Sequence, residues 1–358
     1  MKEIQSDTYS IYIGDKVLYE FNSILENFQD EYSKIFIFCD ENSSKCCLPH
    51  LIGLVPMLIG AEIIEIESGE QSKTLSICND VWKTISESQA DRKSIVVNLG
   101  GGVVCDMGGF IASLYKRGLR FFHIPTTFLS QVDASVGGKL GVDLDGNKNQ
   151  IGLYRNPDLV IIDPIFLETL PARHFISGWA EVFKHALIAD DEYWRFLTQL
   201  NLDNISDIEA VLYQSIFIKN KIVMEDWEEK GPRKMLNFGH TVGHALESQS
   251  LKKNRDLLHG EAIAMGMVVE TILSESSGLL FIDECHEILE KLAEVFPLEK
   301  IDMLEFSDLL KWMQQDKKNI DSQINFTLLS SIGQAKINAS SSLNEIEDAL
   351  NKYNLFLS

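Results

Sequence analysis

Short apolar runs alternate with amphipathic segments through the first half of the chain. The runs are KIFIFC (34–39), EIIEIE (62–67), SIVVNL (94–99), RFFHI (120–124) and LVIID (159–163). Strands that pair in parallel need a crossover connection, usually a helix, so this alternation is typical of a parallel sheet covered by helices. It predicts an α/β domain of nucleotide-binding type, in which ligands bind beyond the carboxyl ends of the strands.

The second half of the chain reads mainly as helices. Long amphipathic stretches cover 178–200, 207–226, 241–250, 260–278 and 283–296, and a short β-like run, INFTLLS (324–330), precedes a last helix. We therefore divide the 358 residues into an α/β domain over 1–170 and a mostly α-helical domain over 171–358. Ligand sites often lie between such domains.

Charge and cysteine usage exclude several classes of partner. The 53 acids and 32 bases give a net charge of −21, which repels nucleic acid and anionic lipid, so we expect neither as a partner. Six scattered cysteines without a CxxC pair fit a reducing compartment. The first residues carry no apolar signal core, and the most apolar stretch is interrupted by Pro56, Glu62 and Glu65. We expect a cytoplasmic protein without a membrane span.

A glycine loop follows the third apolar run, in SIVVNLGGGVVCDMGGF (94–110). Glycines between a strand and a helix let backbone N–H groups approach a pyrophosphate. The dinucleotide fingerprint is not satisfied, because Cys105 stands where its last small residue belongs. From the residues alone the loop is either a phosphate site or a tight turn.

Asp40 follows the first apolar run. An acid at the end of a strand can accept hydrogen bonds from a ribose diol, or it can cap the next helix.

Residues 116–155 form a basic strip in an acidic chain, with six bases against three acids. Glycines precede Lys139 and Lys148, and glycine beside lysine presents both ammonium and backbone N–H groups to an anion. A solvated loop is the alternative. The length of the segment and its Thr, Ser, Gly and Asn content favour a long functional loop.

Three histidines cluster within twenty residues of the second half. His240 and His244 stand four residues apart on a predicted helix and share one face, which is a spacing used for zinc. HTVGH lacks the glutamate of a zinc protease, so a further ligand must come from elsewhere. His259 and Glu181 are the candidates. Two or three imidazoles and one carboxylate suit Zn²⁺ best, and Co²⁺ is the alternative. Spacing alone makes both helix histidines ligands.

These motifs together resemble the 3-dehydroquinate synthase family, in order and over nearly the whole chain. The matching stretches are SGEQSK (68–73), GGGVVCDMGGF (100–110), PTTFLSQVDASVGGK (125–139), GNKNQIG (146–152), SGWAEVFKHALI (177–188), GPRKMLNFGHTVGHALE (231–247), LHGEAIAMGM (258–267) and DKK (316–318). The resemblance implies a Rossmann-like NAD-binding domain followed by a helical metal-binding domain.

The resemblance also implies an activity. Members of this family are lyases of the shikimate pathway, which leads to chorismate and the aromatic amino acids. They convert 3-deoxy-D-arabino-heptulosonate 7-phosphate to 3-dehydroquinate and phosphate, using NAD⁺ catalytically and a divalent metal, usually zinc. A homodimer is expected, in which Arg117 reaches the phosphate site of the neighbouring subunit.

The resemblance assigns the metal to Glu181, His240 and His259, and so removes His244 from the ligand set implied by spacing. The residues expected to act in catalysis are Lys139, Lys184, Lys219, His244 and Asn149. The residues expected to bind substrate are Asp133, Lys148, Arg117, Arg233, Asn237 and one of Lys317 and Lys318. The residues expected to bind NAD are Asp40, Asn42, Glu70, Lys73, Gly101, Gly102, Val103, Asp106, Thr126, Thr127, Lys139, Lys148, Phe166, Leu167 and Thr169.

Three positions depart from the usual pattern of the family. Ser68 stands where Asp is usual, Asp143 where Asn is common and Pro232 where Leu is commoner. None of them removes an expected ligand. The rival interpretations are a cyclase acting on sedoheptulose 7-phosphate or glucose 6-phosphate, a glycerol-dehydrogenase-like oxidoreductase, and a non-catalytic binding protein that has kept the fold.

Overall fold

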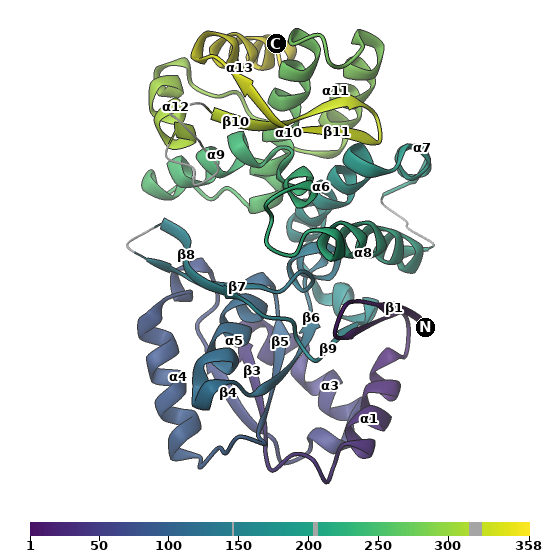
Figure 1. Ribbon diagram of the computed structural model, residues 1–358, viewed down its shortest axis with the longest axis vertical. Helices are drawn as coiled ribbons and strands as arrows, with labels where there is room; N and C mark the ends of the chain where they lie inside the picture. The colour runs from purple at the N-terminus through teal and green to yellow at the C-terminus, as the bar shows by residue number, and fades with distance from the viewer. Residues whose placement is uncertain (145–146, 203–206, 315–323) are drawn as a thin grey trace. The chain divides into compact units, whose positions relative to one another are not determined.

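The structure is a computed structural model that describes residues 1–144, 147–202, 207–314 and 324–358 (Figure 1). The predicted substrate residues Lys317 and Lys318 lie outside the described residues. The chain forms two compact units, Met1–Pro171 with Asp207–Asn220, and Ala172–Ser206 with Lys221–Ser358. The segment Asp207–Asn220 thus belongs to the first unit, although it lies within the predicted second domain. The division of the chain into domains over 1–170 and 171–358 remains a prediction.

A seven-stranded sheet forms the centre of the first unit, in the order β1-β2-β9-β6-β5-β3-β4. The strands are β1 (Lys2–Gln5), β2 (Ser10–Ile13), β3 (Ile35–Asp40), β4 (Glu62–Ile66), β5 (Ile95–Gly100), β6 (Arg120–Pro125) and β9 (Leu159–Ile162). All pairings are parallel except that of β1 with β2. The predicted α/β class and its five strand runs are confirmed.

The order of the strands creates a switch point in the sheet. From β3 the chain moves outward to β4 and then returns to place β5 on the other side of β3. Connections leave β3 and β5 in opposite directions there, which opens a crevice beyond their carboxyl ends. Asp40 ends β3 and Gly100 ends β5, so two predicted features of the cofactor site flank this crevice.

Helices cover both faces of the sheet (Figure 1). They are α1 (Val17–Asn27), α2 (Glu41–Cys46), α3 (Leu48–Leu54), α4 (Leu75–Glu87) and α5 (Gly102–Leu114). Along β3, Ile35 and Ile37 pack into the core that contains α1 and α3, whereas Phe36 and Phe38 pack into the core that contains α4 and α5. Strands buried on both faces must be apolar throughout, which explains the continuous runs.

The segment predicted as a long loop contains a hairpin, so the loop prediction is wrong there. It pairs β7 (Lys139–Leu144) with β8 (Asn147–Tyr154), and β7 packs on α5. Gly141 and Gly152 face each other, and a Cβ on either would lie within 2.7 Å of a backbone oxygen of the opposite strand. The glycines therefore permit close strand pairing.

The first unit also contains short helices. They are η1 (Pro56–Leu58), η2 (Glu70–Ser72), η3 (Tyr115–Arg117), η4 (Ser130–Ala134) and η5 (Pro164–Thr169).

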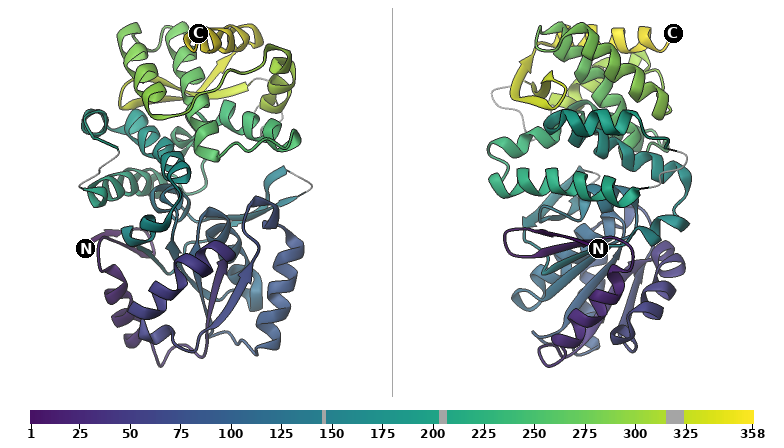
Figure 2. Two further views of the ribbon diagram at one scale, coloured as in Figure 1. Left: turned by 180° about the vertical axis from the view of Figure 1, so that it is seen from behind. Right: turned by 90° about the vertical axis from the view of Figure 1, so that its right-hand side faces the viewer.

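The second unit is mostly helical, as predicted (Figure 2). Its helices are α6 (Ala172–Ala189), α7 (Asp191–Thr198), α9 (His240–Lys252), α10 (His259–Ser276), α11 (Ile282–Val295), α12 (Phe306–Gln314) and α13 (Leu343–Phe356), with the short helices η6 (Pro232–Asn237) and η7 (Met303–Glu305). A hairpin joins β10 (Ile324–Ser331) to β11 (Gln334–Ser341). The helix α8 (Ile208–Glu225) passes from the first unit into the second.

Helix α10 is the core of the second unit. Every residue from Gly260 to Ser274 is buried, and α6, α9, α11, α13 and β10 all contact the helix. A helix without an exposed face is surrounded by other elements, which fits the mainly apolar sequence of α10. Its two interior acids, Glu261 and Glu270, are therefore exceptions that need polar partners.

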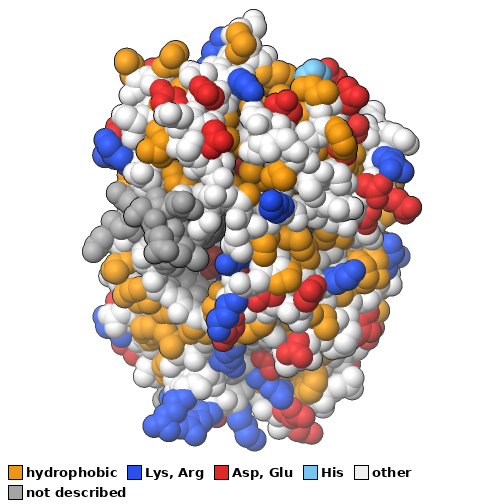
Figure 3. Space-filling model, turned by 45° about the horizontal axis from the view of Figure 1, so that its top comes forward, with side chains coloured by type: hydrophobic (Ala, Val, Ile, Leu, Met, Phe, Trp, Pro, Cys, Tyr) orange, Lys and Arg blue, Asp and Glu red, His pale blue; other side chains and the backbone are white. Residues whose placement is uncertain are grey.

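The surface carries charges of both signs. On the face drawn in Figure 3, acidic and basic side chains are interspersed with apolar ones, so the net charge of −21 does not form one continuous acidic face in this view. Among the described residues, no helix has both the length and the apolarity needed to cross a bilayer.

Candidate active site

Three predicted metal ligands from three helices converge in the second unit. The Nε2 atoms of His240 and His259 each lie 3.4 Å from Oε1 of Glu181. Metal–ligand bonds of about 2.0–2.1 Å in a tetrahedral site place neighbouring ligand atoms roughly 3.3 Å apart. The separations therefore match the edges of a tetrahedron around a metal, and two imidazoles with one carboxylate suit Zn²⁺ or Co²⁺.

Each of these histidines has a partner on its other ring nitrogen. Nδ1 of His240 lies 3.0 Å from the carbonyl oxygen of Phe238, and Nδ1 of His259 lies 3.3 Å from Oε1 of Glu247. A proton on Nδ1 that is donated to such an oxygen leaves the Nε2 lone pair for a metal. Burial alone lowers the pKa of His259, but Glu247 and Glu181 outweigh burial and raise the pKa to about 10. The carboxylates of Glu247 and Glu181 thus stabilise a positive charge at the His259 ring.

His244 lies beside this triad without joining the set around Glu181. Its ring centre is 5.1 Å from that of His240 and 6.1 Å from that of His259. It belongs to a second, overlapping group of possible ligands, with Glu247 and His259. Spacing alone made His244 a ligand, whereas the family resemblance removed it from the ligand set; its exclusion remains a prediction.

Close packing of α9 on α10 brings the two histidines together. Gly239 has φ +79°, and a Cβ on Gly266 would lie 2.0 Å from the carbonyl oxygen of Gly239. Larger residues would separate the helices at this crossing. The glycines in FGHTVGH and AMGM therefore allow the first residues of α9 and α10, His240 and His259, to approach each other.

Glu270 of α10 holds the start of α9. Its carboxylate is fully buried and accepts the backbone N–H groups of Gly239, Thr241 and Val242 at 2.7, 3.1 and 3.2 Å. These N–H groups have no partner within the helix, so the acid replaces a cap from a distant part of the chain. Glu270 was not predicted as a functional residue, although an acid within an otherwise apolar helix was the available signal.

Other predicted residues of the second unit lie on α6 and η6. Lys184 is buried and forms an ion pair with Glu181, one turn away on α6. Arg233 is also buried, and its Nη1 donates to the carbonyl oxygen of Trp227 at 2.6 Å. Nδ2 of Asn237 donates to Oε1 of Glu229 at 2.8 Å. Lys184 therefore adjoins the metal candidate directly.

The predicted cofactor residues all belong to the first unit. They lie beyond the carboxyl ends of β3, β5, β6 and β9, around η2, and on the hairpin β7–β8. Asp40 accepts the N–H group of Ser43 and so caps α2, as the alternative interpretation expected. Gly101 is the N-cap of α5 and offers no side-chain cap, a geometry that suits a phosphate. Phe166 is 3% exposed and belongs to the hydrophobic core.

A ring of hydrogen bonds joins three parts of this region. Nζ of Lys73 donates to Asp106 and to Oδ1 of Asn149, both at 2.6 Å. The N–H group of Asn149 donates to Oδ1 of Asp143 at 2.7 Å, and the N–H group of Asp143 donates to the carbonyl oxygen of Lys73 at 2.8 Å. The ring ties a predicted catalytic residue, Asn149, to two predicted cofactor residues. It also gives Asp143, a departure from the family pattern, a defined contact.

Burial and charge act in opposite directions on the pair of Lys73 and Asp106. Burial lowers the pKa of Lys73, but Asp106 and Glu70 outweigh burial and raise it. Burial raises the pKa of Asp106 despite the neighbouring Lys73. The lysine is therefore held as a cation in the interior of the predicted cofactor site, where it can balance an anionic ligand.

The remaining predicted residues of the first unit fall into three places. Lys219 forms an ion pair with Asp133 at 2.7 Å and donates to the carbonyl oxygen of Asp133. Lys148 lies 3.9 Å from Glu70, and Lys139 is exposed at the start of β7. Arg117 has a left-handed backbone, with φ +72°, and lines a hollow of about 480 Å³ with Asp91, Arg92 and Lys116.

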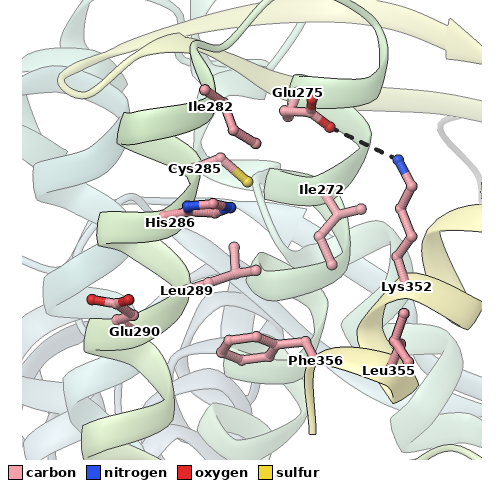
Figure 4. Close-up of a pocket in the computed structure, with 10 residues that line it drawn as sticks. All are labelled: Ile272, Glu275, Ile282, Cys285, His286, Leu289, Glu290, Lys352, Leu355 and Phe356. Atoms are coloured by element: carbon pink, nitrogen blue, oxygen red, sulfur yellow. Dashed lines mark ion pairs between the residues drawn. The ribbon is translucent and has the colours of Figure 1, made fainter. Parts of the chain in front are cut away.

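A second hollow, of about 570 Å³, contains none of the predicted site residues. It lies between α10, α11 and α13, with Ile272, Leu289 and Phe356 toward its interior (Figure 4). Glu275 and Lys352 form an ion pair across it at 3.8 Å.

These features define a class of protein. A parallel α/β unit carries a glycine loop between a strand and a helix, and a helical unit carries a group of side chains that could hold a divalent metal. Comparison with known proteins places the chain within that class.

Family profiles match both halves of the chain. The profile described as 3-dehydroquinate synthase N-terminal matches residues 63–177, and the profile described as 3-dehydroquinate synthase C-terminal matches residues 178–319. The 3-dehydroquinate synthase of Parabacteroides distasonis is 39% identical over 325 residues, which cover 90% of this chain and 92% of the relative. That of Clostridium beijerinckii is 37% identical, with 93% and 95% covered. The chain belongs to the 3-dehydroquinate synthase family.

Solved structures agree with this fold. A 2-epi-5-epi-valiolone synthase from Streptomyces hygroscopicus, with NAD⁺ and Zn²⁺ bound, matches with a TM-score of 0.83 at 26% identity, covering 99% of this chain and 98% of that chain. A 2-deoxy-scyllo-inosose synthase complexed with carbaglucose-6-phosphate, NAD⁺ and Co²⁺ matches with a TM-score of 0.85 at 22% identity, covering 98% and 99%. A probable glycerol dehydrogenase from Sinorhizobium meliloti reaches 0.62 at 15% identity, with 99% of each chain covered, a likeness of fold alone.

Proposed function

We propose that this chain catalyses the 3-dehydroquinate synthase reaction, the conversion of 3-deoxy-D-arabino-heptulosonate 7-phosphate to 3-dehydroquinate and phosphate. The reaction combines transient oxidation, phosphate elimination, reduction and intramolecular aldol ring closure. The observation that carries the proposal is the convergence of Glu181, His240 and His259 in a chain that matches the family over both halves. The enzyme would be a carbon–oxygen lyase of the shikimate pathway.

The metal would be held by Glu181, His240 and His259, whose geometry fits Zn²⁺ or Co²⁺. A bound divalent ion supplies Lewis-acid polarisation of substrate oxygens, which stabilises developing negative charge. The buried Lys184 pairs with Glu181 and would supply a second positive charge beside the reacting oxygens. His244 would hold or pass a proton next to the same position.

NAD would be held at the crevice beyond β3 and β5, where it supplies a reversible hydride acceptor. The N–H groups of Gly101, Gly102 and Val103 would face the pyrophosphate, and Asp40 and Asn42 the adenosine ribose. Lys73 and Asp106 would brace the cofactor through their ion pair. The remaining predicted cofactor contacts are Glu70, Thr126, Thr127, Lys139, Lys148, Phe166, Leu167 and Thr169.

Charged groups would orient the substrate through all steps, which is mainly a positioning task. Lys139, Lys148 and Asn149 would hold the phosphate, with Arg117 of the neighbouring subunit in a homodimer. Arg233 would bind the substrate carboxylate, since a guanidinium matches a carboxylate with two hydrogen bonds. The further contacts proposed for the substrate are Asp133, Lys219, Asn237 and one of Lys317 and Lys318.

A phosphate-release assay tests the function. The heptulosonate phosphate should release phosphate only when both NAD⁺ and a divalent metal are present, and no NADH should accumulate, because the oxidation and the reduction cancel. Stoichiometric NADH would indicate a dehydrogenase instead. Equal turnover of sedoheptulose 7-phosphate or glucose 6-phosphate would indicate another sugar phosphate cyclase.

Two further properties belong to the same proposal. A homodimer is needed for Arg117 to complete the phosphate site, so a fully active monomer would contradict that assignment.

All six cysteines are free, and five of them are buried, which supports a reducing compartment such as the cytoplasm.

A further inference from the structure

We propose that Glu247 is a positioning residue of the metal centre, which holds the His259 ring with Nε2 directed at the metal. This inference rests on the proposed function, because it concerns the same metal site. Glu247 does not belong to the expected ligand set of Glu181, His240 and His259. It is the last residue of the motif GPRKMLNFGHTVGHALE (231–247), and no role was predicted for it.

Glu247 contacts the ring of His259 directly. Oε1 of Glu247 lies 3.3 Å from Nδ1 of His259, while Nε2 of the same ring lies 3.4 Å from Glu181. The imidazole is thus held between two carboxylates, one at each nitrogen. A neutral imidazole has one N–H group, and a carboxylate at Nδ1 keeps that hydrogen there, so Nε2 presents its lone pair.

Glu247 is more deeply buried than the ring that it contacts. Glu247 is 4% exposed on α9, whereas the side chain of His259 is 29% exposed at the first position of α10. A partly exposed ring at a helix start can rotate unless something holds it. Because Glu247 is embedded in α9, the ring of His259 is tied to the helix that carries His240, and both imidazoles share one frame.

The same geometry offers Glu247 a competing role, as a ligand. Glu247, His244 and His259 form the second group of potential ligands, so the acid could itself bind the metal through an alternative set. The two roles differ in what a partial replacement does. A positioning acid tolerates an amide that still accepts a hydrogen bond, whereas loss of a ligand removes metal outright.

Zinc affinity separates these roles. We would measure Zn²⁺ dissociation constants of the full chain by competition with a chromophoric chelator, for the wild type, Glu247→Gln, Glu247→Ala and His259→Ala. Loss of an orienting partner typically weakens metal binding about 10- to 100-fold. Glu247→Ala should fall in that range, Glu247→Gln should lie between it and the wild type, and His259→Ala should be weaker than both.

The matched control is Glu261→Gln. Glu261 is a buried acid of the same α10 turn that accepts the N–H group of Leu258 and pairs with Arg173. Its replacement disturbs the start of α10 without a contact to the His259 ring. It should leave the dissociation constant within about threefold of the wild type, well short of the effect of losing an orienting partner. Thermal unfolding of each metal-free variant verifies that it folds.

A spectroscopic measurement adds a readout that is independent of turnover. In the cobalt-loaded protein, each ligating histidine with a protonated Nδ1 gives a paramagnetically shifted exchangeable proton signal. The signal from His259 should weaken or vanish in Glu247→Ala and remain in Glu261→Gln. Wild-type zinc affinity in Glu247→Ala would overturn the inference, as would a loss in Glu247→Gln as complete as in His259→Ala. Failure of the wild type to bind metal would instead overturn the proposed function.

Discussion

At the scale of single residues, burial decides how the charged groups behave. Asp163 directly follows β9, is 2% exposed and accepts the N–H group of Ile165. Burial raises the pKa of Asp163 to about 6, with Asp15 adding repulsion. The folded protein therefore retains a proton that the unfolded chain releases near pH 4, so the free energy of unfolding falls as the pH rises from 4 to 7.

The variant Asp163→Asn cannot titrate at this position and should lack that fall. A difference of two pKa units corresponds to roughly 3 kcal/mol, so the wild type should lose up to that much stability relative to the variant between pH 4 and 7. Chemical denaturation of both proteins across this pH range measures the difference. Parallel stability curves would contradict the prediction.

Arg233 supports a second prediction about a single residue. Its guanidinium is buried and oriented by the carbonyl of Trp227, so little rotational freedom is lost when it binds a carboxylate. Arg233→Ala should weaken transition-state binding by roughly 2–5 kcal/mol, measured as kcat/KM with the heptulosonate phosphate. Arg233→Lys keeps the charge without the paired donors and should recover part of the loss. Wild-type kcat/KM in Arg233→Ala would exclude a role in binding the carboxylate.

At the scale of elements, the start of α9 depends on an acid from another helix. Removal of Glu270 leaves three buried N–H groups without their acceptor, so Glu270→Ala should lower the free energy of unfolding by roughly 2–4 kcal/mol. Because His240 is the first residue of α9, zinc affinity should fall as well. Glu275→Ala on the same helix removes only a partly exposed ion pair and should cost less than about 1 kcal/mol. Equal losses in both variants would refute the capping role.

Elements also show which parts of the fold can be predicted from sequence. Strands buried on both faces are apolar throughout, so the runs at β3, β5 and β6 were recognisable. The hairpin β7–β8 was missed because its glycines and polar residues follow the composition of a loop. Two buried acids were missed for different reasons. Glu247 looks like an ordinary helix acid until the folding of α9 against α10 places it beside His259. Glu270 was recognisable as an acid within an apolar helix, but its contacts at the start of α9 depend on the packing of the two helices.

The candidate ligand set shows the same limit. Residues on one helix can be grouped by spacing, so His240 and His244 were paired. Glu181 and His259 lie on two other helices, and no local pattern reports their distance from His240. They could be named only as candidates from the sequence, and the family resemblance then assigned them as ligands.

At the scale of the whole molecule, bound groups should add to stability by mass action. A ligand that binds only the folded protein stabilises it by about 2.7 kcal/mol at a concentration one hundred times its dissociation constant. Treatment with EDTA should therefore abolish phosphate release and lower the melting temperature, and Zn²⁺ or Co²⁺ should restore both. His259→Ala should show no such response to zinc. Full activity in a demonstrably metal-free sample would refute metal dependence.

The positions of the two ligating histidines have an electrostatic consequence. His240 and His259 are the first residues of α9 and α10, so two helices direct the positive ends of their dipoles toward the place proposed for a cation. Each end can repel a positive ion by about 0.3–1 kcal/mol. A buried acid stands at each of them, Glu270 at α9 and Glu261 at α10. These acids offset the positive ends of the two helices locally, so the backbone dipoles do not prevent this site from holding a cation.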